Sequence, residues 1–147
     1  MEQYIGTKIV KAEPATRCMH DDGGLQWGYC TKVERGYHIL YPDGCEGWCP
    51  KDAFEEAYRP TDGMSFGLAI EAAKKGKKIQ RAGWNGKNQY VELATRIGYV
   101  NADGVYMNVE HKAIGNKAFA FVGTSGVQLG WLASQADMLA DDWRIVE

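Results

Sequence analysis

Gly130-Trp131-Leu132-Ala133-Ser134-Gln135-Ala136-Asp137-Met138-Leu139-Ala140-Asp141-Asp142-Trp143 carries the clearest structural signals in this 147-residue chain. Ser134 favours a helix start, because a serine side chain can cap the free N–H groups of a first turn. Asp137 stands three residues later, where an acidic side chain completes a weak form of the capping box. Trp131 and Trp143 flank the segment. The stretch therefore predicts the end of a strand, a short helix and a final strand over 143–146.

Apolar periodicity predicts a second helix earlier in the chain. Phe66, Ala69, Ile70 and Ala73 follow the spacing of an amphipathic helix, and Gly76 provides its end. Runs of β-forming residues between turn signals predict strands over 77–84, 89–94, 119–122 and 127–131. Residues 97–114 are predicted as a further hairpin or a mobile loop. We therefore expect residues 64–147 to be α+β, with an antiparallel β-sheet and two short helices.

The first 60 residues predict a separate, smaller α+β module with a β-hairpin and a helix. Its expected elements are a strand over 4–12 closed by Pro14, a loop over 16–28, a hairpin of 35–41 with 45–49, and a helix over 51–58. Pro42-Asp43-Gly44 supports the hairpin, because proline presets φ and glycine accepts positive φ in a turn. Residues 59–63 are the expected linker. We thus predict two domains, 1–60 and 64–147.

Composition limits the classes of function. Hydrophobic residues make up 45% of the chain and charged residues 24%, which is typical of a soluble globular protein. The net charge of −2 provides no general basic field, so binding to a nucleic acid polymer is not expected. No apolar run approaches the length of a membrane span or of a signal-peptide core, so we expect no membrane partner.

The chain has four cysteines, Cys18, Cys30, Cys45 and Cys49. In a cytosolic protein we expect them to be reduced. Nearby histidines allow a zinc site to be considered, but the sequence holds no Cys-x-x-Cys pair. We predict no metal site and no cofactor.

Two tryptophans are the expected ligand platform. Trp84 precedes an Asn-Gly turn, and Trp131 precedes the capped helix, whose free backbone N–H groups can face an anion. Stacking of a nucleotide base on such a ring contributes about 1–3 kcal/mol. The alternative is that both indoles are core residues. Trp143, at the start of a strand, is expected in the core.

Five polar side chains around these tryptophans are predicted to contact a ligand. Asn85, Ser134 and Asp137 offer hydrogen bonds that suit ribose hydroxyls, and Arg81 and Lys87 can neutralise a diphosphate. Each also has a structural alternative. Asn85 can be a turn residue, Ser134 and Asp137 a helix cap, and the two cations a solvated strand edge.

Candidates for catalysis are poor. His111 lies in a polar segment, and Asp141 and Asp142 are adjacent residues whose side chains point apart. The sequence has no nucleophile elbow and no glycine-rich phosphate loop. We predict no catalytic residue and a protein that is not an enzyme.

Three stretches together resemble one protein family. They are the helix over 65–76, the turn Arg81-Ala82-Gly83-Trp84-Asn85-Gly86, and the Gly130–Trp143 segment. Over Met64–Glu147 the chain is similar to the second type of Thoeris anti-defence protein, found in phages. Residues 1–60 resemble a small phage module without an assigned role.

The resemblance implies a sponge that does not cleave its ligand. Such a protein sequesters the cyclic ADP-ribose isomer that a bacterial TIR-domain enzyme makes during infection, and some members also hold cyclic dinucleotides. The family further implies a homo-oligomer, a tetramer, with pockets between protomers. It would act in the cytoplasm of the infected bacterium.

Two other functions stay open. A phage nucleotide or ADP-ribose hydrolase could use Asp137 or Asp142 with a metal ion. A structural or host-takeover protein could bind another protein through residues 1–60. Mixing the chain with a cyclic ADP-ribose isomer distinguishes these functions, because a sponge returns the ligand intact and a hydrolase converts it.

Overall fold

The computed structural model describes residues 1–3, 6–19, 32–84, 88–113 and 115–147. Contacts between Cα atoms divide the chain into two compact units, Met1–Arg59 and Pro60–Glu147. Both units contain antiparallel sheets, and the three helices of the described chain are short. The predicted α+β class is therefore confirmed.

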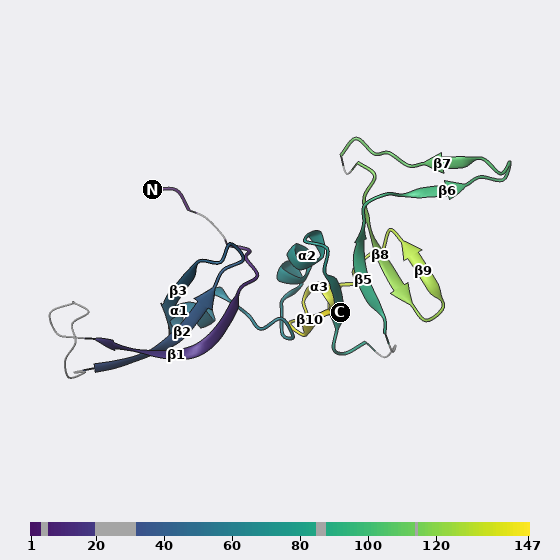
Figure 1. Ribbon diagram of the computed structural model, residues 1–147. Coiled ribbons are helices and arrows are strands. Elements are labelled where there is room, and N and C mark those ends of the chain that lie inside the picture. The colour runs from purple at the N-terminus through teal and green to yellow at the C-terminus, as the bar shows by residue number, and fades with distance from the viewer. Residues whose placement is uncertain (4–5, 20–31, 85–87, 114) are drawn as a thin grey trace. The chain divides into compact units, whose positions relative to one another are not determined.

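The first unit is a three-stranded antiparallel sheet in the order β1-β2-β3, followed directly by a helix (Figure 1). Its elements are β1 (Lys11–Met19), β2 (Lys32–Leu40), β3 (Glu46–Pro50) and α1 (Lys51–Ala57). Ile39 of β2 is 2% exposed. Tyr37, Phe54 and Tyr58 stack in a ladder, with centroid distances of 4.2 and 4.7 Å. This ladder fixes α1 against β2.

The first strand lies later in the chain than the sequence predicts. Pro14 falls inside β1 and pairs with Tyr37, whereas we expected it to close a strand over 4–12. Proline is tolerated there because β1 is an edge strand and its outer side needs no N–H donor.

Cys18, also in β1, is disulfide-bonded, so the expectation of reduced cysteines is wrong at this position. Cys45 and Cys49 are free.

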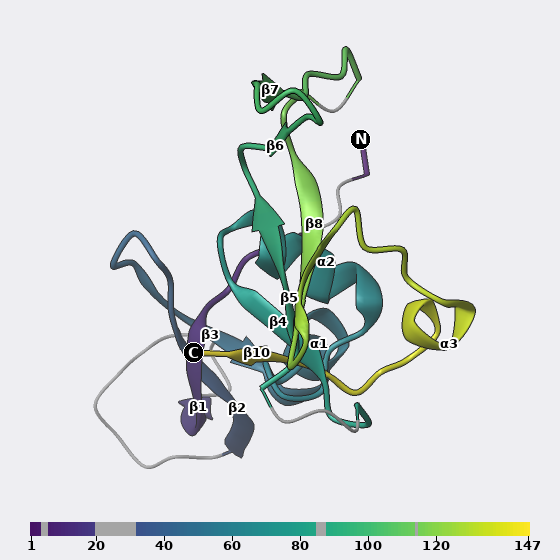
Figure 2. The same cartoon turned by 90° about the vertical axis from the view of Figure 1, so that its right-hand side faces the viewer.

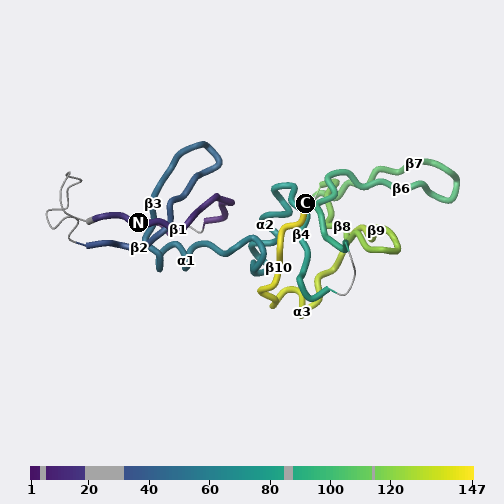
Figure 3. The backbone as a smooth tube through the Cα atoms, turned by 60° about the horizontal axis from the view of Figure 1, so that its bottom comes forward, coloured from purple at the N-terminus to yellow at the C-terminus, as the bar shows by residue number. Residues whose placement is uncertain are grey.

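The second unit is built on a five-stranded antiparallel sheet in the order β10-β4-β5-β8-β9. The sheet strands are β4 (Lys78–Arg81), β5 (Tyr90–Ala94), β8 (Ala118–Gly123), β9 (Gly126–Leu129) and β10 (Trp143–Val146). The helices are α2 (Phe66–Lys74) and α3 (Gln135–Met138). The last strand in the chain, β10, pairs with β4, the strand of this sheet that comes first in the chain (Figure 3). Both predicted helices and the final strand over 143–146 are confirmed.

Helix α2 packs its alanine face against the sheet. Ala69, Ala72 and Ala73 are 0–3% exposed, and small side chains let a helix approach β4 and β10 closely. Ile79 of β4 and Val91 of β5, which are register partners, are both fully buried. Gly76 follows the helix with a φ of +82°, which a glycine adopts without strain. This core holds the strand ends that carry the candidate site.

A second hairpin, formed by β6 (Gly98–Val100) and β7 (Tyr106–Asn108), extends beyond the end of β5 and β8 (Figure 2). The structure thus selects the hairpin from the two alternatives that the sequence left for residues 97–114. Its apolar side chains are exposed, and they are Tyr99, Val100, Val105, Tyr106, Met107 and Val109. Within the described chain no helix has the length and apolarity that crossing a membrane requires.

Candidate functional site

Three tryptophans from distant parts of the sequence meet at the end of the five-stranded sheet. The ring centroids of Trp84 and Trp131 lie 6.2 Å apart, those of Trp84 and Trp143 5.4 Å, and those of Trp131 and Trp143 6.2 Å. All three pairs meet edge to face, an arrangement that aromatic rings prefer. Trp143 is fully buried, which confirms its prediction as a core residue. Trp84 and Trp131 are half-buried, so each keeps some surface for a ligand.

Two phenylalanines complete the aromatic cluster. Phe66, the first residue of α2, lies 6.4 Å from Trp131 and 5.5 Å from Trp143 between ring centroids. Phe121 of β8 lies 5.3 Å from Trp84. These contacts support both half-buried indoles, Trp131 through Phe66 and Trp84 through Phe121. Their orientation is therefore set by packing before any ligand arrives.

Asp137 lies at the centre of the polar part of the site. One carboxylate oxygen accepts from Arg81 Nη1 at 3.1 Å and from Trp84 Nε1 at 3.3 Å. The other accepts from the backbone N and the Oγ of Ser134, at 3.1 and 2.7 Å. Four bonds match the roughly four lone-pair sites of a carboxylate. Asp137 thus holds the Trp84 indole, the Arg81 guanidinium and the start of α3 together.

Ser134 and Asp137 form the capping box that the sequence indicates. Ser134 Oγ accepts from the backbone N of Asp137 at 3.1 Å, and the Asp137 side chain returns the bond to the backbone N of Ser134. The backbone carbonyl of Asp137 also accepts from Trp143 Nε1 at 2.9 Å. The short helix α3 is therefore fastened at both its cap and its last turn.

Arg81 is held between two carboxylates. Its Nε donates to Asp142 at 2.8 Å, and its Nη1 donates to Asp137 and to the carbonyl of Ala136, both at 3.1 Å. The Arg81 side chain is 20% exposed. Its cationic group is thus committed to linking β4 with α3 and with the residue before β10.

Asp142 clamps the turn that presents Trp84. Its second carboxylate oxygen accepts from the backbone N of Gly83 at 3.0 Å, and its own carbonyl accepts from the backbone N of Ala82 at 3.0 Å. The turn after β4 is therefore tied to the strand start at Trp143. Because Trp84 follows Gly83 directly, this clamp decides where the Trp84 indole stands.

Hydrogen bonding sets the protonation of both carboxylates. The bond from Arg81, helped by the N–H of Gly83, holds the pKa of Asp142 below its ordinary value. Burial raises the pKa of Asp137, but hydrogen bonds from Ser134, Arg81 and Trp84 outweigh that effect and lower it. The bonds to Asp142 and then Asp137 raise the pKa of Arg81. All three groups are charged at neutral pH.

The structure brings five of the seven predicted site residues together, namely Arg81, Trp84, Trp131, Ser134 and Asp137. The other two, Asn85 and Lys87, lie outside the described residues. Contact of any of the seven with a ligand stays a prediction. The role that the structure does give to Arg81, Ser134 and Asp137 is to fix the position of the tryptophans.

Sequence reasoning missed the part played by Asp142, Phe66 and Phe121. Asp142 reaches Arg81 because Trp143 pairs with Arg81 in the antiparallel register of β10 and β4. The sequence alone does not give that register.

The described residues contain no group of three or more His, Cys, Asp or Glu side chains placed to hold a metal ion.

Comparison with known proteins identifies the class to which this fold and site belong. The domain described as Thoeris anti-defense 2-like matches residues 64–146, more than half of the chain, so the chain belongs to that family. A protein of Bacillus phage SP01 named Thoeris anti-defense 2 is 38% identical over 89 residues, which are 56% of this chain and 94% of the phage protein. The resemblance stated from the sequence is confirmed, and it supports an anti-Thoeris function in phage infection.

Proposed function

We propose that the chain is a sponge: it binds the cyclic ADP-ribose isomer that a TIR-domain enzyme makes, and so blocks Thoeris-type immunity without cleaving the signal. The observation that carries this proposal is the pair of half-buried tryptophans, Trp84 and Trp131, whose centroids lie 6.2 Å apart. Both belong to the part of the chain that matches the Thoeris anti-defense 2-like family. They offer a preformed aromatic surface for a nucleotide base.

From the charge balance of the site we infer that a pocket for this ligand requires a further cation. Arg81 faces the carboxylates of Asp137 and Asp142, so this network has an excess of negative charge and does not attract a diphosphate by itself. The helix α3 has four residues, too few for a strong dipole. The anionic part of the ligand therefore requires a further cation, for which Lys87 or a second protomer is the source we propose.

The affinity that a sponge needs also requires contacts beyond the tryptophan site. A nanomolar sponge needs about −12 kcal/mol of binding free energy. Stacking of the single base supplies roughly 1–3 kcal/mol. The remainder must come from enclosure of the ligand and from paired phosphate groups. A pocket completed by another copy of the chain provides both.

Exposed apolar side chains support assembly of the chain with itself. β9 is an edge strand of the five-stranded sheet, with Val127 at 64% and Leu129 at 48% exposure. Leu132 and Leu139, on either side of α3, are 87% and 80% exposed. Contiguous exposed apolar patches mark interaction surfaces, and we propose that these side chains contribute to such a patch. We propose a homo-oligomer, a tetramer, with ligand pockets between protomers, acting in the cytoplasm of the infected host.

The same ligand separates the sponge from the alternatives. The chain is incubated with a cyclic ADP-ribose isomer and passed through an ultrafiltration membrane, and free ligand is measured by chromatography before and after heating. We expect depletion of the filtrate and full recovery of the ligand on heating. A new nucleotide product would establish hydrolysis instead. An unchanged filtrate would leave a structural or protein-binding role, and a parallel titration with a cyclic dinucleotide tests the second ligand class.

A further inference from the structure

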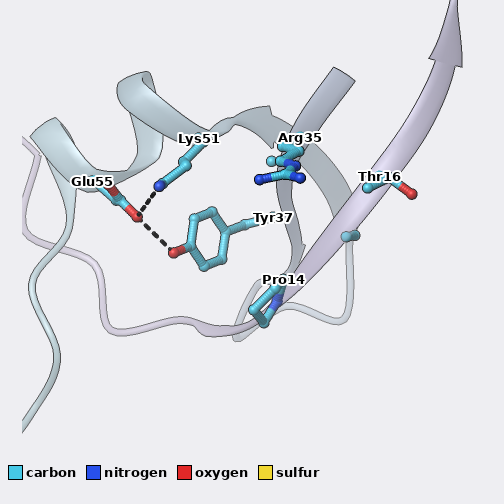
Figure 4. Close-up of a pocket in the computed structure, with 8 residues that line it drawn as sticks. Pro14, Thr16, Arg35, Tyr37, Lys51 and Glu55 are labelled. Atoms are coloured by element: carbon cyan, nitrogen blue, oxygen red, sulfur yellow. Dashed lines mark hydrogen bonds and ion pairs between the residues drawn. The ribbon is translucent and has the colours of Figure 1, made fainter. Parts of the chain in front are cut away.

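The first unit contains a pocket that lies outside the region matched by the anti-defence family. It has a volume of about 430 Å³ and is lined by residues of β1, β2 and α1 (Figure 4). Ligand pockets usually measure about 300–1,000 Å³. The family match begins at residue 64, so the function proposed above assigns no role to this pocket.

The sheet register places four pocket residues on one face. Arg35 and Tyr37 are two positions apart on β2, and their partners on β1 are Thr16 and Pro14. Side chains two residues apart in a strand point to the same side of the sheet. Gly36 lies between them, and the Trp48 ring packs closely against it on the opposite face. A Cβ added at Gly36 would lie only 2.5 Å from that ring. The pocket face is therefore backed by a tightly packed sheet.

The aromatic wall of the pocket is fixed in place. One side of the Tyr37 ring stacks on Phe54 at 4.2 Å and 22°. The Tyr37 hydroxyl donates to Glu55 at 2.9 Å. A ring held by stacking and by a hydrogen bond loses little entropy when it contacts a flat ligand.

The pocket carries one uncompensated positive charge. Lys51 and Glu55, one turn apart on α1, form an ion pair at 4.0 Å. The Arg35 guanidinium has no hydrogen bond or ion pair to any of the residues that the structure describes. In Figure 4 dashed lines join Glu55 to Lys51 and to Tyr37, whereas none reaches the Arg35 guanidinium. An unpaired arginine is suited to planar, two-point binding of a carboxylate or phosphate.

We propose that this pocket binds a small molecule that has a flat ring and one carboxylate or phosphate group. The anionic group pairs with Arg35, because the charge of Lys51 is already balanced by Glu55. The ring lies against Tyr37 and Pro14. This site is independent of the tryptophan site of the second unit.

Titration calorimetry on the full chain tests the proposal with four probes. Phenyl phosphate and benzoate are the two candidate chemistries, and inorganic phosphate and phenol carry only the anion or only the ring. We expect at least one of the candidates to bind about tenfold more tightly than both partial probes, because a charge-assisted pair and ring contact act together. Equal affinity for inorganic phosphate, or no binding of either candidate, would overturn the proposal.

Arg35→Gln is the decisive variant, with Lys11→Gln as its matched control. Both positions lie on the paired strands β1 and β2 and are exposed, and both changes remove one positive charge, but Lys11 does not line the pocket. We expect Arg35→Gln to weaken binding about tenfold or more, and Lys11→Gln to leave it within about twofold. Equal weakening by both variants would show only general charge attraction and would refute the site.

A peptide is the competing occupant. Tighter binding of a hexaglutamate peptide than of either ring probe, lost in Arg35→Gln, would replace the small molecule with an acidic protein segment and so overturn the proposal. None of these probes is a nucleotide, and none of the pocket residues belongs to the second unit. Failure here is therefore a separate result from failure of signal capture.

Discussion

Arg81 and Asp142 are joined by a 2.8 Å hydrogen bond although 61 residues separate them in the sequence. The same carboxylate accepts from the backbone N of Gly83 at 3.0 Å. Together these bonds tie the turn that carries Trp84 to the strand that begins at Trp143. The position of the half-buried Trp84 indole thus depends on a carboxylate that need not touch a ligand.

Asp142→Ala should destabilise the second unit. The change removes a charge-assisted bond to Arg81 and leaves the Gly83 N–H without its acceptor. Because the Asp142 side chain is 36% exposed, we expect a loss of about 1–2 kcal/mol in unfolding free energy. Urea denaturation measures it. Asp141→Ala, an exposed neighbour, is the matched control and should change stability by less than about 0.5 kcal/mol. Equal effects of the two variants would contradict the clamp.

The same carboxylates predict how stability depends on pH. The folded-state pKa values of Asp137 and Asp142 lie below the unfolded value of 3.8. Their contribution is therefore complete above the unfolded pKa, and it is lost as the pH falls through the lower folded values. The urea midpoint should drop between about pH 5 and pH 2, and less so in Asp142→Asn. If the urea midpoint of Asp142→Asn depends on pH in the same way as that of the wild type, the charge of Asp142 does not contribute to stability.

Much of the second unit could be predicted from local sequence signals. The helix over 66–74 follows from apolar spacing, and the start of α3 follows from the Ser134–Asp137 capping pair. The final strand over 143–146, predicted to follow the capped helix, is also found. Local chemistry fixes these elements, so no knowledge of tertiary contacts was needed.

The parts that failed depend on contacts across the chain. The sequence predicts that Pro14 closes a strand, and only the edge position of β1 explains why it lies within one. The bonds of Arg81 to Asp137 and Asp142 require the register of β10 against β4. From sequence, Arg81 therefore appeared as a cation open to phosphate, whereas the folded chain pairs it internally.

A fragment that starts at Met64 should fold and keep ligand binding, because the aromatic cluster lies wholly after that residue. The relative from Bacillus phage SP01 supports this, since the matched 89 residues make up 94% of it. One bond is lost, however, because the carbonyl of Thr61 accepts from the backbone N of Ile145 at 2.8 Å. A fragment from Pro60 should thus be more stable by about 0.5–1.5 kcal/mol in urea denaturation.

Binding of the cyclic nucleotide by a folded Met64 fragment decides whether residues 1–63 contribute to the pocket. Affinity equal to that of the full chain is expected. Loss of binding with retained far-ultraviolet circular dichroism would show that the first unit completes the pocket or the oligomer. The fragment from Pro60 serves as the control for the lost Thr61 bond.

Trp84→Ala and Trp131→Ala should each weaken binding of the cyclic ADP-ribose isomer by about 1–3 kcal/mol, the value of one base stack. Both rings also support the core, so circular dichroism must first confirm folding. Trp48→Ala makes the same deletion in the first unit and should leave affinity unchanged. Wild-type affinity in both folded variants, measured by titration calorimetry, would show that the ligand binds elsewhere.

The bound ligand should be released chemically intact. Asp137 accepts four hydrogen bonds, and Asp142 is paired with Arg81. Both have lowered pKa values, so at neutral pH neither is a proton donor and both are weak bases. A site of this kind stabilises a bound molecule but has little means to favour a transition state over it.

Mass spectrometry of the heat-released fraction shows whether the ligand is intact. The melting temperature of the protein, measured at increasing ligand concentration, reports binding. A ligand that binds only the folded state stabilises it by about 2.7 kcal/mol at one hundred times its dissociation constant, and the released mass should equal the added mass at every time point. A linear or cleaved nucleotide that accumulates with time, in proportion to protein and more slowly in Asp137→Asn, would establish a hydrolase. Asp141→Asn, which changes an exposed carboxylate beside the site, controls for the loss of one negative charge.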